Sequence, residues 1–245
     1  MRTGAGAATV AVVTSLVRAV EHGGLTLLTV QTPDLTLGFL PQRGGRLVSV
    51  RSEGREFLWH DPLVLTDALH PVPGAQPLPD AADGEGSGSG SGDAAPGGGE
   101  FSVEVVEEPG VVEIVLTGAA DAASGLMVTR TFRIPARGGS FLQTSQLTNA
   151  SDRPVRWSVS ELVQVDRSPG GDAEDRQDAT VLRHADGAVE FTHGGRTLRI
   201  TGAPLTVEGG PDPDPGRDHV ELELAGHPTT LAPGRSTALH LRWSV

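Results

Sequence analysis

Acidic, imidazole and guanidinium side chains alternate with apolar residues in two strand-like segments near the C-terminal end of the chain. In the first segment Glu221 and Glu223 alternate with leucine and valine and follow His219; in the second, His240 and Arg242 alternate with leucine and tryptophan. Successive residues of a strand point to opposite faces, so these five side chains gather on one patch if the two strands pair. Carboxylates beside imidazoles suit general acid–base catalysis. A solvated outer face with cross-strand ion pairs produces the same pattern.

Two further charges fall in phase with the apolar face of a strand-like segment. Arg130 lies between Val128 and Phe132, and Glu161 lies between Val159 and Val163. A buried charge is costly unless it is paired. The sequence therefore leaves two interpretations open, a buried Arg130–Glu161 ion pair or a wet concave face that binds a ligand. A β-bulge in either strand would turn its charged residue to the outer face, and neither interpretation would then be needed.

The short motifs that usually bind metals or phosphates do not match. Asp212, Asp214 and Asp218 lie in a Pro/Gly-rich turn whose spacing differs from that of an EF-hand loop. Gly44-Gly45 is too short for a phosphate loop and precedes no helix pattern. The chain also has no Gly-x-Ser-x-Gly nucleophile elbow. We expect no metal and no cofactor.

Composition excludes several classes of chemistry. The 245 residues contain no Cys, which excludes disulfides, thiolate catalysis and cysteine-ligated zinc. The net charge of −12 is uneven, because residues 56–129 hold 13 Asp and Glu and no Arg. Nucleic-acid binding needs clustered basic residues, and attraction to anionic lipid needs a basic patch. We therefore expect neither a nucleic-acid nor a membrane partner.

Short strand-like runs separated by Gly/Pro turns fill the chain after residue 24, and no convincing amphipathic helix appears among them. This pattern favours an all-β fold, a large antiparallel sandwich. The expected strands cover 25–30, 35–40, 46–50, 56–59, 101–106, 111–117, 126–134, 141–148, 155–166, 180–183, 189–192, 196–200, 205–207, 219–224 and 237–243.

The segment 68–99 interrupts this pattern with five prolines and a Gly/Ser run. Such composition behaves as flexible coil, so we expect one sandwich domain over 1–245 with 68–99 as a disordered insertion loop. Near the N-terminus, the apolar run 7–17 is too short to span a bilayer. No small-residue cleavage site stands out after it. We expect a cytoplasmic protein, with export as the alternative.

Three segments resemble the galactose mutarotase superfamily, which includes the aldose 1-epimerases. The first runs from Leu35 to Trp59 and contains a strand, Pro41, the Gly44-Gly45 turn and a second strand before Leu58-Trp59. The second, Leu147–Val155, resembles the family's central "tN-x-s-d-x-p" turn, and the third, Leu231–Ser236, its closing "L-x-P-G-x-s" turn. They occur in the family's order over most of the chain.

The resemblance implies a super-sandwich that binds a sugar in a groove on one sheet. In active aldose 1-epimerases a C-terminal-region glutamate acts as base on the anomeric hydroxyl, and a histidine after the central turn acts as acid toward the ring oxygen. Glu221 and Glu223 are the candidates for the base. The position of the histidine falls near Ser160 or Glu161, where this chain departs from the pattern. Candidate sugar-binding residues are Arg46, Arg130, Glu161, Trp157, His219, His240 and Arg242.

Three functions remain open at this point. The first is a divergent sugar epimerase that uses Glu221 or Glu223 with a non-standard acid. The second is a non-catalytic carbohydrate-binding module, and the third is a structural or interaction domain that has lost the ancestral site. A groove that holds a carboxylate and a second proton carrier would favour the first. Whether the chain is an enzyme is thus undecided from the sequence.

Overall fold

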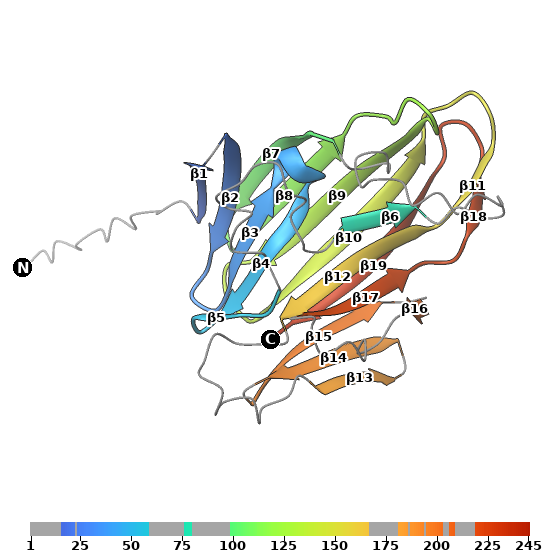
Figure 1. Ribbon diagram of the computed structural model, residues 1–245. Coiled ribbons are helices and arrows are strands. Elements are labelled where there is room, and N and C mark those ends of the chain that lie inside the picture. The colour runs from blue at the N-terminus through green and yellow to red at the C-terminus, as the bar shows by residue number, and fades with distance from the viewer. Residues whose placement is uncertain are drawn as a thin grey trace, which may run out of the picture.

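The computed structural model describes residues 16–22, 24–58, 76–79, 99–166, 181–185, 187–193, 195–202, 206–208 and 219–245. Its elements are almost all β-strands (Figure 1). Alternating apolar and polar residues produce this result directly. In β8 (Val111–Gly118), for example, Val112, Ile114 and Leu116 are buried, while the residues between them keep exposed surface. Within the described residues, no helix is long and apolar enough to cross a membrane.

One layer of the fold is an eight-stranded antiparallel sheet. In spatial order its strands are β13 (Val181–Ala185), β14 (Ala188–His193), β15 (Arg196–Gly202), β19 (Ser236–Ser244), β10 (Ser140–Asn149), β9 (Leu126–Pro135), β8 and β7 (Phe101–Glu108). The C-terminal strand β19 therefore lies inside the sheet, between β10 and β15.

The second layer consists of two smaller sheets. The five-stranded sheet is formed in order by β1 (Val17–His22), β2 (Leu25–Gln31), β3 (Thr36–Leu40), β4 (Arg46–Ser52) and β5 (Arg55–Glu56), with the 3-10 turn η1 (Pro41–Arg43) before β4. The four-stranded sheet has the order β16 (Thr206–Glu208), β17 (His219–Ala225), β12 (Val159–Asp166) and β6 (Gln76–Pro79). A β-bridge between Leu58 and Val165 joins the two. Both lie over the eight-stranded sheet in Figure 1.

A single large core fills the space between the layers. It takes Leu37 and Phe39 from β3, Val163 from β12 and Leu222 from β17, and it packs them against the inward faces of β8, β9, β10 and β19. Aromatic contacts cross or line this space: the rings of Phe39 and Phe132 lie 4.8 Å apart, and those of Phe141 and Trp243 stack at 5.5 Å. The predicted all-β sandwich is confirmed.

Three local expectations were wrong. Within 68–99, expected to be loop, Gln76–Pro79 forms β6 at the edge of the four-stranded sheet and pairs with Val159–Leu162. An edge strand tolerates proline because one side of it needs no N–H donors. The single strand expected over 155–166 breaks at Ser158, which separates β11 (Val155–Trp157) from β12. Strand β11 instead pairs with β18 (Thr229–Leu231). Apart from β6 and Gly99, the 68–99 segment lies outside the described residues.

The third correction concerns the expected pairing of the two C-terminal strands. Strand β17 pairs with β12 and β16, whereas β19 pairs with β10 and β15. The two strands belong to different layers because the β17–β18 segment runs along β12 and β11, and the chain then crosses to the other sheet. The polar residues of β17 and β19 therefore do not form a single patch.

Candidate functional site

Arg130 and Glu161 meet in the interior of the sandwich. Arg130 comes from β9 in one layer and Glu161 from β12 in the other, and Nη2 of the arginine lies 2.6 Å from Oε2 of the glutamate. Both side chains have no exposed surface. Of the two interpretations left open by the sequence, the structure favours the buried ion pair. Neither side chain has surface with which to contact a ligand, although both were candidate sugar-binding residues.

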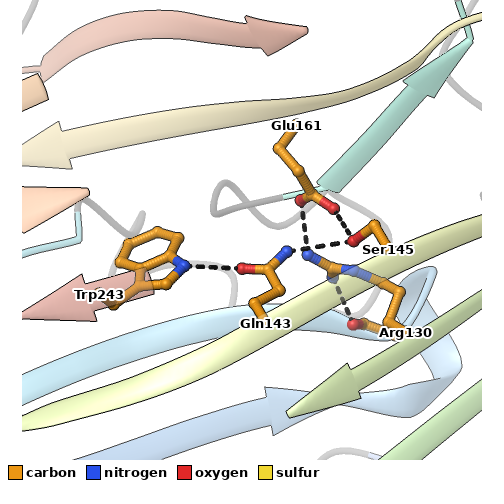
Figure 2. Close-up of polar contacts among 6 residues, drawn as sticks. Arg130, Gln143, Ser145, Glu161 and Trp243 are labelled. Carbon is orange, nitrogen blue, oxygen red and sulfur yellow. Dashed lines mark hydrogen bonds and ion pairs between the residues drawn. The ribbon is translucent and has the colours of Figure 1, made fainter. Parts of the chain in front are cut away.

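A chain of hydrogen bonds surrounds this pair (Figure 2). Nη1 of Arg130 donates to the carbonyl of Gly45 at 2.6 Å, and Oγ of Ser145 donates to the other carboxylate oxygen of Glu161. The amide of Gln143 then donates to Ser145 at 3.2 Å and accepts from Nε1 of Trp243 at 2.9 Å. The network ties three strands of the eight-stranded sheet to β12 and to the Gly44-Gly45 turn.

Burial and pairing act in opposite directions on these two charges. Burial raises the pKa of the Glu161 carboxyl, while the charge of Arg130 and the hydrogen bonds from Ser145 and Gln143 oppose that rise. Burial likewise lowers the pKa of the Arg130 guanidinium, and Glu161 opposes it. Each charge is therefore tolerated in the interior because the other is present.

Glu223 occupies the opposite, outward face of the β12–β17 pair. Its neighbours in sequence, Leu222 and Leu224, are fully buried in the core, so strand alternation directs Glu223 away from it. The residue pairs across the strands with Leu162. Its side chain is half-buried and makes no hydrogen bond or ion pair with any residue that the structure describes.

The same register places the two positions at which the resemblance implies a histidine, Ser160 and Glu161, on opposite faces of β12. Ser160 and Leu162 lie on the outward face with Glu223, while Glu161 points into the core. Ser160 pairs with Ala225, two residues along β17 from Glu223. Ser160 is itself fully buried, so neither of the two positions keeps exposed surface.

Three other predicted site residues lie on β17 and on β11. Glu221 pairs with Gln164 and His219 pairs with Asp166, both between β17 and β12, but the side chains of Glu221 and His219 lie outside the described residues. Trp157 ends β11, and its half-buried ring packs against the core. Its Nε1 is buried and has no hydrogen-bond partner within the described structure.

His240 and Arg242 lie on the outer face of the eight-stranded sheet. They are exposed residues of β19, and Nδ1 of His240 hydrogen-bonds Oγ1 of Thr144 at 3.0 Å. They line a shallow depression of about 370 Å³ together with Leu142, Gln143, Thr144, Gly187, Thr201, Gly202 and Leu241. Because β17 belongs to the other layer, this depression contains none of the β17 residues.

Arg46 opens β4 and belongs to a cluster of arginines that sequence reasoning missed. Burial, with Arg130 and Arg43 nearby, lowers the pKa of Arg46 to about 10. Arg43 ends η1, and its Nε atom is buried without a partner in the described part of the chain. The two arginines flank Gly44-Gly45 in the sequence, and this spacing is the signal that could have identified them together.

A metal site has no support in the described residues, which contain no group of three or more His, Cys, Asp or Glu arranged to hold an ion. The Asp212, Asp214 and Asp218 turn lies outside that part of the structure.

Comparison with known proteins identifies the fold. No family profile matches the sequence, and no curated protein matches it. Among solved structures, the chain is similar to a candidate aldose 1-epimerase of Escherichia coli K12, with a TM-score of 0.61 and 15% identity over 90% of this chain and 99% of the other. A candidate aldose 1-epimerase of Klebsiella pneumoniae gives a TM-score of 0.62 and 16% identity, over 93% of this chain and 82% of that one.

A galactose mutarotase-like protein of Clostridium acetobutylicum is similar over 93% of this chain and 97% of its own, with a TM-score of 0.59 and 10% identity. Similarity at these identities establishes the fold. The chain has the galactose mutarotase-like sandwich fold, as the three sequence segments led us to expect.

Proposed function

We propose that the protein binds a sugar on the outward face of β12 and β17, where Glu223 accepts hydrogen bonds from sugar hydroxyl groups. The Glu223 carboxylate carries this proposal, because it is half-buried and has no partner among the residues that the structure describes. A carboxylate that has lost part of its water without gaining a protein partner is costly to the free protein. Hydroxyl donors from a ligand would satisfy it.

The surroundings of Glu223 support a polar, uncharged ligand. Leu162 and Gln164 share its face and keep exposed surface, whereas Ser160 on the same face is fully buried. The register also places Glu208 of β16 opposite Glu223, and Glu221 two residues before it on β17. Carboxylates beside apolar and amide surface suit the hydroxyl donors and the apolar ring face of a sugar. The mutarotase-like fold over about nine-tenths of the chain adds weight to a carbohydrate ligand.

Binding without the ordinary epimerase chemistry is favoured by Ser160. General acid catalysis near neutral pH needs a group whose pKa lies near the working pH. A serine hydroxyl is not such a group, and Glu161 is held by Arg130 and Ser145 in the core. Among the side chains that the structure describes on this face, Glu223 is a candidate base and none is a histidine; the side chains of His219, Glu221 and Glu208 are not among them.

Isothermal titration of the full chain with a panel of monosaccharides and oligosaccharides tests the proposal. We expect heat of binding with at least one sugar, and an affinity about tenfold or more weaker in Glu223→Gln. That loss corresponds to a hydrogen bond to a charged group, worth about 1.5–3 kcal/mol.

Glu113→Gln is the matched control. Glu113 is a half-buried glutamate of β8, in the other layer, and its replacement by glutamine removes the same charge. The control should bind as the wild type does. A protein that gives no heat with any sugar, or equal affinities in Glu223→Gln and the wild type, would contradict the proposed site.

A second candidate function is the interconversion of sugar anomers. Glu223 supports it, because a carboxylate without a partner among the described residues is free to act as the base. Polarimetry of α-D-glucose and α-D-galactose measures how fast they reach anomeric equilibrium, with and without the protein. Acceleration that disappears in the Glu221→Gln/Glu223→Gln double variant would establish catalysis and point to an acid other than the expected histidine. Binding without acceleration would leave a carbohydrate-binding protein.

A further inference from the structure

We propose that Arg43 and Arg46 form a binding site for an oxyanion, the phosphate or carboxylate group of a ligand, at the turn from η1 into β4. The site is separate from the proposed sugar face and does not depend on it. It rests on two positive charges that have no partner among the described residues.

Among the described residues, the guanidinium groups of Arg43, Arg46 and Arg130 lie near one another at this turn. Arg130 donates to the carboxylate of Glu161 and to the carbonyl of Gly45, so that carboxylate is already paired. Neither Arg43 nor Arg46 makes a hydrogen bond or an ion pair through its side chain with a residue of the described ranges. Two positive charges therefore lack a counter-charge there.

The positive charges of the three arginines repel one another. Burial is the largest cause of the lowered pKa of Arg46, and the positive charges of Arg130 and Arg43 lower it further. The lowered value of about 10 still leaves Arg46 protonated at neutral pH. A bound anion would relieve both the desolvation and the repulsion at once.

Access separates Arg43 and Arg46 from Arg130. The first two are half-buried and retain exposed surface, whereas Arg130 has none. An anion arriving from solvent would therefore meet Arg43 and Arg46. The planar guanidinium fork matches the two oxygens of a carboxylate or phosphate.

Backbone amides of the adjacent turn are already used. The N–H of Gly44 donates to the carbonyl of Gly99, and the N–H of Gly45 donates to that of Pro41. The site therefore consists of the two guanidinium groups and not of a phosphate-binding loop.

Thermal unfolding of the full chain at pH 7 tests the proposal, with inorganic phosphate as the probe and sodium chloride at matched ionic strength as the reference. We expect phosphate to raise the Tm by several degrees beyond the effect of chloride. In Arg46→Met the apparent affinity for phosphate should fall at least tenfold, and the Tm without phosphate should rise. An arginine with a purely structural role would lower the Tm when removed.

Arg133→Met is the matched control, because Arg133 is an exposed residue of β9 and the change of net charge is the same. This variant should keep the response to phosphate, while Arg43→Met should weaken it. Glucose 6-phosphate and glucuronate, tested in the same way, distinguish a phosphate from a carboxylate ligand. An equal response to chloride and phosphate, or a phosphate response retained in both Arg46→Met and Arg43→Met, would overturn the proposal.

Discussion

The guanidinium of Arg130 and the carboxylate of Glu161 meet at 2.6 Å between the two layers of the sandwich, and neither side chain has exposed surface. The contact joins β9 of the large sheet to β12 of the four-stranded sheet (Figure 2). The pair links the two layers of the sandwich, and the proposed ligand face lies on the other side of β12.

Removal of one member of this pair should destabilise the protein strongly. We expect Glu161→Gln to lower the free energy of unfolding by about 3–5 kcal/mol, because Arg130 remains as a buried charge without its partner. The Arg130→Met/Glu161→Gln double variant should recover much of that loss. Denaturant unfolding of the wild type, both single variants and the double variant measures the coupling. Effects that simply add would show that the two charges do not depend on each other.

Asn149 links two of the turns that carried the family resemblance. Its Nδ2 donates to the carbonyls of Arg153 at 2.8 Å and Leu231 at 2.9 Å, and its Oδ1 accepts from Ser151. The central turn is thus tied to the closing turn through one fully buried side chain. This explains why the only asparagine of the sequence stands there.

Asn149→Asp should therefore lower the free energy of unfolding by about 2–4 kcal/mol, because the buried carbonyl of Leu231 and the partly buried carbonyl of Arg153 lose their donor and face a carboxylate. The aspartate keeps the acceptor toward Ser151, so this variant isolates the two donated bonds. Ser151→Ala is the milder comparison, expected to cost less than about 1.5 kcal/mol. Equal losses in the two variants, measured by urea unfolding, would show that the bonds to Arg153 and Leu231 contribute little.

The sandwich architecture was predictable because its strands are locally amphipathic. Alternation in Val111–Gly118 or Leu126–Pro135 indicates a strand and its buried face without knowledge of any partner. The phase of that alternation also placed Arg130 and Glu161 on the core face. A buried ion pair could thus be inferred as one of two interpretations.

Strand pairing was not predictable in the same way. Strand β19 lies between β10 and β15, and β17 lies beside β12, through contacts far apart in the sequence. The expected patch of Glu221, Glu223, His240 and Arg242 depended on such a pairing and was wrong for that reason. Strand β6 was missed because Pro77 and Pro79 suggest a loop unless the strand is known to lie at an edge.

Gly45 should not tolerate a side chain. Its φ of 59° lies in the left-handed region, and an added Cβ would stand 2.9 Å from the ring of Phe101. Gly45→Ala should lower the free energy of unfolding by about 1–3 kcal/mol and disturb the carbonyl that accepts from Arg130. Gly24→Ala is a useful comparison, because its φ is also positive and no atom lies within 4 Å of the added Cβ. A similar loss in both variants would assign the effect to backbone strain alone.

Arg46 should give the protein an unusual response to alkaline pH. Its pKa in the folded state is about 10, below the ordinary value of an arginine, so between these two values the unfolded chain holds about one more proton than the folded protein. Stability rises with pH wherever the unfolded state binds more protons, here by roughly 1 kcal/mol per pH unit. The sequence contains no Lys, Tyr or Cys, so these common alkaline titrations do not obscure the effect.

Urea unfolding from pH 9 to pH 12 should show this rise in stability in the wild type and in Arg133→Met. The profile of Arg46→Met should be flatter, and a wild-type profile that is flat or falling over this range would show that Arg46 keeps an ordinary pKa.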